Sequence, residues 1–184
     1  MTKHKPKIII VGAGLSGLTL ALSLAQSNFD IVVLEQASQL SEVGAGIQIS
    51  ANGARVLHLL GLESELAKVA FRPEQGEMRH WKTGETLISR PLGKTSVERF
   101  GFPYYHMHRY DFHRLLETAT RAAAPNAIRL QARVDTIKQN DRGVSAVLTS
   151  GDVIEGDVLI GCDGIHSVVR ETLFGADDPH FTGC

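Results

Sequence analysis

Three glycines near the start of the chain, Gly12, Gly14 and Gly17, stand at the spacing of the G-x-G-x-x-G pattern. Glycines at this spacing allow a tight turn, a close approach of the backbone to a diphosphate, and close packing of a helix on a strand. Glu35 follows 18 residues after Gly17, where a carboxylate accepts hydrogen bonds from a ribose diol. These residue types therefore predict a site for a dinucleotide.

The elements expected around these residues place them at one edge of a sheet. The apolar run Ile8–Val11 predicts a buried parallel strand, and Ile31–Leu34 predicts a second strand that ends at Glu35. Between them, an apolar stripe at helical spacing runs from Leu15 to about Asn28. The N-terminus of that helix offers N–H groups and a positive dipole end to a phosphate. We therefore expect a βαβ unit in an α/β fold.

A second glycine-rich segment follows, in which Gly44 and Gly46 lie on either side of Ala45 in a predicted turn. A glycine turn that returns towards the ligand favours a cofactor extending beyond its adenosine end, with Gln48 projecting towards a ring system. An ordinary flexible connection with a solvated Gln48 explains the same residues. Helices are expected next, over about Gly53–Leu60 and Glu63–Ala70.

Two later segments carry side chains suited to cofactor binding. Arg109 lies where a β-like segment enters a helix, so its guanidinium can contact a diphosphate or form an ion pair with Asp111 or Glu117. The segment Val158–Arg170 again runs from a buried strand into a glycine turn and a helix start. Asp163 in that turn can bind a ribityl or ribose hydroxyl, or can cap the turn through backbone N–H groups.

The middle of the chain interrupts the βαβ pattern. Gly76–Thr83 and Glu85–Arg90 predict two antiparallel strands, and Pro91–Phe100 predicts a loop before the β segment Phe102–His108. This block predicts a separate antiparallel layer. The later elements are expected as a helix over Asp111–Ala124, strands over Ile128–Leu130, Val134–Gln139, Val144–Thr149 and Asp157–Gly161, and a helix over Ser167–Leu173.

Composition and the remaining residues exclude several other classes. The net charge of −1 does not indicate a nucleic-acid partner. The four apolar residues before Gly12 are too few for a signal-peptide core or a membrane span, so we expect a cytoplasmic protein without a membrane partner. Cys162 and Cys184 have no metal or disulfide spacing, and His106 and His108 lack a carboxylate cluster, so no metal is expected.

Taken together, the motifs resemble a known family. The sequences GAGLSG from Gly12, GAGIQIS from Gly44, HRYDFHRLL from His108 and GCDGIHSVVR from Gly161, with Glu35, occur in the order found in single-component FAD-dependent aromatic hydroxylases. The chain is most similar to salicylate hydroxylase-like, hydroxybenzoate and hydroxynicotinate monooxygenases, and the resemblance covers essentially all 184 residues. It implies a Rossmann-like FAD-binding three-layer domain with part of an antiparallel β substrate domain.

The resemblance also implies residue roles. The glycine pattern holds the ADP half of FAD, Glu35 holds the adenosine ribose, and Arg109 contacts the cofactor. Asp163 and Gly164 serve both FAD and the NADH or NADPH that reduces it, while Gly44–Gln48 lies along the flavin. The full cofactor-binding set implied in this way is Gly12, Gly14, Leu15, Gly17, Glu35, Gln36, Gly46, Ile47, Arg109, Val134, Asp163 and Gly164.

Members of that family are longer, and most of their substrate-domain sheet follows the position of Cys184. The resemblance therefore implies the N-terminal portion of such an enzyme, and strands left without partners after Gly76 agree with it. Residues 1–70 are expected to form the FAD-binding βαβ unit and glycine loop, and 71–108 the start of the substrate domain. Residues 109–175 then continue the FAD-binding domain, and 176–184 begin the return to the substrate domain.

The implied activity of the intact protein is NAD(P)H- and O2-dependent hydroxylation of a small aromatic acid, and the 184-residue chain alone is expected to be inactive. Two alternatives stay open. One is an NAD-dependent dehydrogenase, although the β block from Gly76 contradicts a continued βαβ rhythm. The other is a truncated nucleotide-binding module without catalysis. The residues assign no catalytic base, oligomeric state or particular aromatic substrate.

Overall fold

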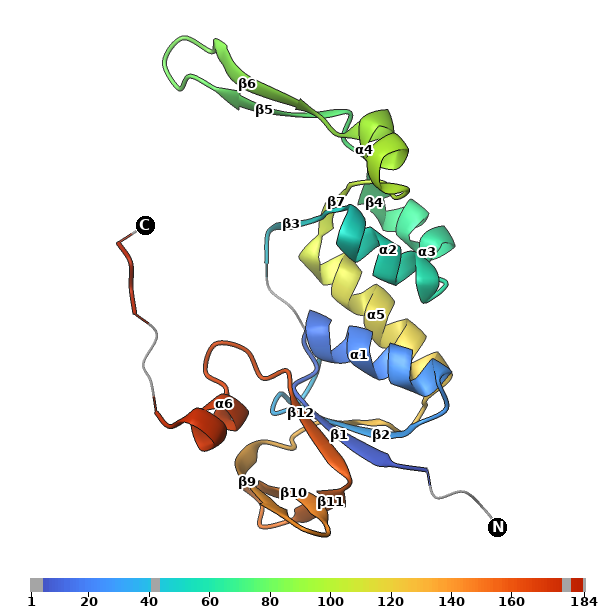
Figure 1. The fold of residues 1–184 in the computed structure, drawn as a ribbon, viewed down its shortest axis with the longest axis vertical. Helices are drawn as coiled ribbons and strands as arrows, with labels where there is room; N and C mark the ends of the chain where they lie inside the picture. The colour runs from blue at the N-terminus through green and yellow to red at the C-terminus, as the bar shows by residue number, and fades with distance from the viewer. Residues whose placement is uncertain (1–4, 41–43, 177–179, 184) are drawn as a thin grey trace. The chain divides into compact units, whose positions relative to one another are not determined.

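A computed structural model describes residues 5–40, 44–176 and 180–183. The chain forms two compact units, each with its own sheet (Figure 1). The first unit takes the described residues of 1–41 and 116–184, and the second takes those of 42–115. Helix α5 (Arg109–Ala123) contributes residues to both units.

The first unit is built on a four-stranded parallel sheet in the order β12-β1-β2-β8. Strand β1 (Lys7–Val11) pairs with β2 (Asp30–Leu34) on one side and with β12 (Val158–Gly161) on the other. Strand β8 (Ile128–Arg129) extends the sheet beyond β2. The core strands β1 and β2 are nearly continuous apolar runs because both faces of the sheet are covered.

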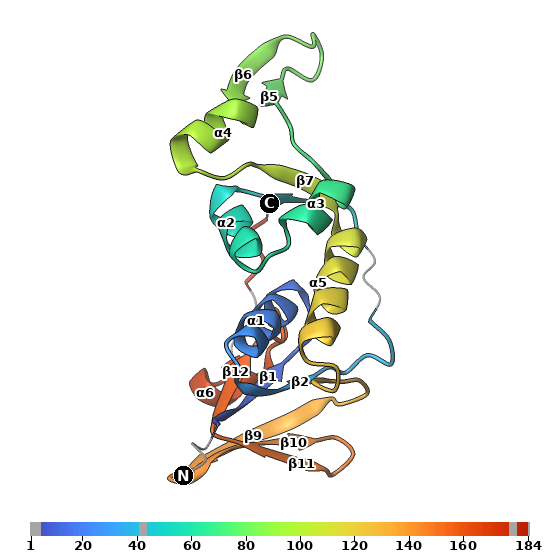
Figure 2. The same cartoon turned by 90° about the vertical axis from the view of Figure 1, so that its right-hand side faces the viewer.

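Helices cover one face of this sheet, as Figure 2 shows. Helix α1 (Leu15–Gln26) packs on β1 and β2 and buries Leu18 and Leu22. The end of α5 lies beside α1, where the buried Thr120 hydroxyl donates a 3.2 Å hydrogen bond to the Leu18 carbonyl. The βαβ unit predicted from the sequence is therefore confirmed.

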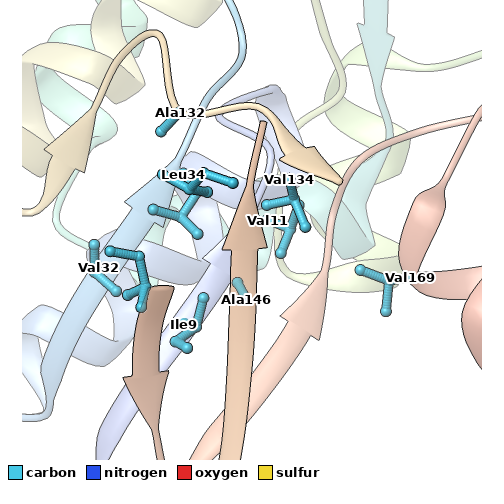
Figure 3. Close-up of a cluster of buried hydrophobic side chains, with 10 residues drawn as sticks. Ile9, Val11, Val32, Leu34, Ala132, Val134, Ala146 and Val169 are labelled. Carbon is cyan, nitrogen blue, oxygen red and sulfur yellow. The ribbon is translucent and has the colours of Figure 1, made fainter. Parts of the chain in front are cut away.

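A three-stranded antiparallel sheet covers the opposite face. It consists of β9 (Val134–Asn140), β10 (Gly143–Leu148) and β11 (Val153–Gly156) in the order β11-β10-β9. Figure 3 shows the apolar side chains that meet between the layers, to which α6 (Val168–Phe174) adds one. The buried cluster comprises Ile9, Val11, Val32, Leu34, Ala132, Val134, Ala146, Leu148, Ile154 and Val169. The first unit is thus the expected three-layer Rossmann-like domain.

The second unit contains an antiparallel sheet in the order β3-β7-β4. Its strands are β3 (Gly46–Ile49), β7 (Tyr105–His108) and β4 (Ala70–Phe71). Two helices, α2 (Ala51–Leu59) and α3 (Glu63–Val69), connect β3 to β4. The buried side chains of this unit include Ala54, Leu57, Leu66, Tyr105 and Met107.

A hydrogen-bond cluster surrounds the fully buried Tyr105. Its hydroxyl lies 2.8 Å from Nε2 of His58 and accepts a 3.1 Å hydrogen bond from the Arg72 guanidinium. Because Arg72 only donates, the hydroxyl proton is available to His58 Nε2. The guanidinium also stands 5.2 Å from the centroid of the Tyr105 ring. These contacts satisfy the buried hydroxyl and fix strand β7 against its neighbours.

The rest of the second unit is a hairpin and one more helix (Figure 2). Strands β5 (Gln75–Arg79) and β6 (Thr86–Pro91) pair antiparallel, as the sequence predicts. The loop predicted over Pro91–Phe100 is wrong, because Gly93–Phe100 forms helix α4. The hydroxyl of the buried Ser96 donates to the Phe102 carbonyl at 3.0 Å, and α4 packs against α2, so local and tertiary contacts stabilise this helix. Gly101, at φ 78°, then ends the helix in the left-handed region.

Three smaller differences separate the sequence-based expectations from the structure. Gly46, predicted to lie in the glycine-rich turn with Gly44, is the first residue of strand β3. Strands β4 and β11 are absent from the predicted elements. Helix α2 begins at Ala51 rather than Gly53, and α5 begins at Arg109. Among residues 5–40, 44–176 and 180–183, no helix combines the length and the apolar character needed to cross a membrane.

Candidate cofactor-binding site

A cavity of about 410 Å³ lies in the first unit, where β1, β2 and β12 end. Ligands of open α/β sheets bind in this position, outside the carboxyl ends of the strands. Three turns and the start of β9 surround the cavity. They contribute Val11, Gly12, Gly14, Leu34, Glu35, Gln36, Ala132, Arg133, Val134, Cys162, Asp163, Gly164, Ile165, His166 and Val168.

The three glycines of the first turn have different surroundings. A Cβ atom on Gly12 would lie 2.5 Å from the Cys162 carbonyl oxygen, and one on Gly17 would lie 2.0 Å from the Gly12 oxygen. Gly12 also adopts φ 99°, which favours glycine. A Cβ on Gly14 would meet no described atom within 4 Å. The first and third glycines therefore allow the turn to close, whereas Gly14 leaves open space beside the cavity.

Helix α1 begins at this open position. Gly14 is its N-cap, and because glycine has no side chain the N-cap residue forms no side-chain capping hydrogen bond. The main-chain N–H groups of the first turn therefore lack the side-chain acceptor that many helices have. Such a terminus, on a helix of 12 residues, matches the requirements of a diphosphate.

Glu35 is held by the main chain on both sides. Its Oε2 accepts a 2.8 Å hydrogen bond from the Ala13 N–H, and its Oε1 accepts a 2.9 Å bond from the Ala37 N–H. A carboxylate has about four lone-pair positions, so each oxygen can accept one further hydrogen bond. The site therefore presents a fixed acceptor pair of the kind that a ribose diol needs.

Asp163 caps helix α6. One of its carboxylate oxygens accepts a 2.6 Å hydrogen bond from the Ser167 hydroxyl, and the other accepts a 3.2 Å bond from the Val169 N–H. Ser167 is itself the N-cap and accepts from the Arg170 N–H at 3.0 Å. Of the two interpretations that the sequence left open for Asp163, the structure shows the capping contacts. Gly164, at φ 77°, completes the turn.

Cys162 contributes a thiol to the cavity lining. Partial burial raises its pKa above the ordinary value by disfavouring the thiolate, and the neighbouring Asp163 carboxylate raises it further. The thiol is therefore protonated at neutral pH. Cys162, Arg133 and His166 were missing from the sequence-based set. Their only signal was that Cys162 and Arg133 adjoin Asp163 and Val134 and that His166 follows Gly164 by two residues, because side-chain direction in a turn has no periodic pattern.

The structure divides the predicted binding residues between the units. Gly12, Gly14, Glu35, Gln36, Val134, Asp163 and Gly164 line the one cavity, and Leu15 and Gly17 lie on α1 beside it. Gly46, Ile47 and Arg109 belong to the second unit, where the first two lie in β3. Arg109 is the first residue of α5, and its N–H donates to the Ala45 carbonyl at 3.2 Å. Glu117, one suggested partner of Arg109, pairs with Arg121 at 2.9 Å.

Metal binding has no support in the part of the chain that the structure describes, since no three His, Cys, Asp or Glu side chains there form a group able to hold an ion. The chemistry of the cavity is instead that of a nucleotide site. It combines main-chain N–H donors, a fixed carboxylate and glycine backbone open to a ligand. The fold and the cavity thus define a dinucleotide-binding α/β domain.

The profile of the family described as FAD binding domain matches residues 5–177, and the chain belongs to that family. It is 39% identical over 183 residues to the 3-amino-4-hydroxybenzoate 2-monooxygenase PtnB3 of Streptomyces platensis. It is 38% identical over 182 residues to a 6-hydroxynicotinate 3-monooxygenase of Pseudomonas fluorescens. These alignments cover 100% and 98% of the chain but only 45% and 46% of the relatives.

A solved structure agrees with this assignment. The crystal structure of Klebsiella pneumoniae HpxO, complexed with FAD and uric acid, superposes with a TM-score of 0.77 at 27% identity. The superposition covers 93% of this chain and 42% of that protein. The chain thus spans less than half the length of these relatives. The family assignment also rules against the alternative hypothesis from the sequence, that the protein is an NAD-dependent dehydrogenase.

Proposed function

We propose that the chain is the FAD-binding part of an NAD(P)H-dependent flavoprotein monooxygenase that hydroxylates an aromatic acid. One observation carries the proposal: a single cavity joins the open Gly14 at an uncapped helix start to the fixed carboxylate of Glu35. The diphosphate of FAD would accept from the N–H groups at the start of α1, and the adenosine ribose would donate to Glu35. The family match supports FAD as the dinucleotide.

The substrate class comes from the relatives. The names of two of them specify 3-amino-4-hydroxybenzoate and 6-hydroxynicotinate, and both substrates are small aromatic acids with a hydroxyl group. We therefore propose a substrate of the salicylate, hydroxybenzoate or hydroxynicotinate type, with O2 as co-substrate. When bound, FAD would supply the redox chemistry that accepts electrons from NADH or NADPH and activates O2. The cytoplasm, where these cofactors are abundant, is the proposed location.

The remaining residue roles extend this proposal. Main-chain and side-chain groups of Leu15, Gln36 and Val134 would contact the ADP half, and Gly46, Ile47 and Arg109 are proposed as further cofactor contacts. Asp163 would act by holding the Gly164 turn in place. In the intact protein, residues 71–108 would begin the substrate domain, 109–175 would continue the FAD-binding domain, and 176–184 would begin the return.

Reconstitution tests the proposal directly. FAD is titrated into the purified 184-residue chain, and flavin fluorescence and absorbance report binding. The intact protein should carry flavin and should oxidise NADH or NADPH faster when a hydroxylated aromatic acid is added. Colourless intact protein that cannot be reconstituted with FAD would contradict the proposal.

A second candidate is a nucleotide-binding module without catalysis. The observation that favours it for this chain is that the relatives are more than twice as long as the part it matches. This candidate predicts that the 184-residue chain binds FAD or ADP but gives no aromatic-dependent NAD(P)H oxidation. Steady-state turnover by the chain alone with FAD, NAD(P)H and a phenolic acid would exclude it.

A further inference from the structure

Gly44 and Arg109 are in close contact within the second unit. A Cβ atom built on Gly44 would lie 3.1 Å from Cδ of Arg109, 3.6 Å from its Cβ and 3.8 Å from its Cγ. Three consecutive carbons of one side chain thus stand near a single main-chain position. The aliphatic part of Arg109 therefore lies across the α-carbon of Gly44.

The main chain of Arg109 is fixed by the same short segment. Its N–H donates to the carbonyl of Ala45 at 3.2 Å, and the preceding residue, His108, stands opposite Gly46 in the β3–β7 ladder. Residues 44–46 thus contact both the aliphatic part of the Arg109 side chain and the main chain at this position. A long, flexible side chain held in this way loses less conformational freedom when its guanidinium binds an anion.

We propose that Gly44 is a positioning residue for Arg109, because the missing side chain lets the arginine stem lie against the main chain and so directs the guanidinium. This inference rests on the proposed function, in which Arg109 contacts the FAD diphosphate or an adjoining part of the cofactor. Bidentate contacts of arginine with phosphate depend on the orientation of the planar guanidinium. A side chain at position 44 would change that orientation.

The surroundings of Gly44 make a clean substitution possible. The three atoms nearest to a Cβ at Gly44 all belong to the Arg109 side chain, so alanine or valine there would displace that side chain. Gly76 provides a control outside the proposed binding residues, because a Cβ there would lie 3.4 Å from Leu92 Cδ1, an ordinary van der Waals contact. Gly44→Ala and Gly44→Val can therefore be compared with Gly76→Ala in the same unit.

The first measurement uses the cofactor-free 184-residue chain. Nuclear Overhauser contacts should join the Gly44 α-protons to the δ- and γ-protons of Arg109. The Arg109 Nε–H resonance should shift in Gly44→Ala, shift further in Gly44→Val, and stay unchanged in Gly76→Ala. Absence of the contacts in the unsubstituted chain, or equal resonance shifts in all three variants, would overturn the inference.

The second measurement is FAD affinity from flavin fluorescence. We expect the Kd to rise about threefold in Gly44→Ala and about tenfold in Gly44→Val, since a misdirected guanidinium loses part of a charge-assisted contact. In an Arg109→Ala background, Gly44→Val should cause no further loss. An equal loss with and without Arg109 would show that Gly44 acts otherwise. If the unsubstituted chain binds no FAD, the proposed function fails, while the resonance measurement still decides the positioning role.

Discussion

The Glu35 carboxylate and the Ala13 main-chain N–H are joined by a 2.8 Å hydrogen bond between residues 22 positions apart. This bond ties the end of β2 to the glycine turn that follows β1, and the other carboxylate oxygen holds the Ala37 N–H. The residue expected to bind a ribose thus also organises the turn that would receive the diphosphate. Both functions follow from one carboxylate because each of its oxygens can accept two hydrogen bonds.

Glu35→Ala should therefore destabilise the chain without any ligand. The substitution leaves two main-chain N–H groups without their acceptor. Because hydrogen bonds to a charged group are stronger than neutral ones, we expect the unfolding free energy to fall by about 2 kcal/mol. Urea denaturation of the cofactor-free protein measures it. Glu155→Ala, an exposed carboxylate on β11, is the control and should change stability by less than about 0.5 kcal/mol. Equal midpoints for the two variants would refute the structural role of Glu35.

Asp163 and Ser167 give a second prediction, about the start of α6. Ser167→Ala removes the acceptor of the Arg170 N–H and should cost about 1 kcal/mol, the usual effect of losing an N-cap. Asp163→Ala removes the acceptor of the Ser167 hydroxyl and of the Val169 N–H, and it should cost more because hydrogen bonds to a charged acceptor are stronger. Denaturation with and without saturating FAD separates the possible roles. If Asp163→Ala lowers the unfolding free energy equally with and without FAD, Asp163 acts through the helix cap. If the decrease is larger with FAD, the carboxylate contacts the ligand.

The sequence predicts the βαβ unit well because its signals are local. Apolar runs, helical spacing and the glycine pattern lie within residues 7–35, and the structure places β1, α1 and β2 within one or two residues of the expected bounds. The turn that ends β12 is predictable for the same reason. The backbone geometry that these glycines allow is a property of the residues themselves.

Features that depend on distant contacts are not predictable in this way. Helix α4 has a leucine as N-cap and a glycine as first residue, so its local signals favour a loop, and it depends on the buried Ser96 and on packing against α2. The hydrogen bond from the Ala13 N–H to Glu35 was equally unpredictable. The glycine pattern gives residue types and spacing, but it does not show which carboxylate oxygen faces which N–H group. The lining positions of Arg133 and His166 depend on how three turns meet.

Cys162 gives a prediction about pH. Its pKa is raised above the ordinary value of 9.0, so the folded state binds the thiol proton more tightly than the unfolded state does. The associated stabilisation is complete below the unfolded pKa and is lost as the pH rises through and beyond it. Iodoacetamide should therefore label folded Cys162 more slowly than the urea-unfolded chain at pH 8.5, in a Cys184→Ser background. Because Cys162 lines the cavity, FAD should slow the labelling further, and labelling at the unfolded rate would contradict the burial of the thiol.

Gly14 and Gly17 should separate ligand binding from folding. Gly17→Ala places a methyl group 2.0 Å from the Gly12 oxygen, so the turn must move, and we expect a loss of about 3 kcal/mol or more in unfolding free energy. In Gly14→Ala the new methyl group meets no described atom within 4 Å. The unfolding free energy of this variant should therefore differ from that of the unsubstituted chain by less than about 0.5 kcal/mol. The same methyl group stands where the diphosphate must approach the main chain, so the Kd for FAD should rise by about tenfold or more. Urea denaturation and flavin fluorescence, applied to both variants, measure the two effects. A Gly14→Ala chain that binds FAD normally would place the diphosphate elsewhere than at the start of α1.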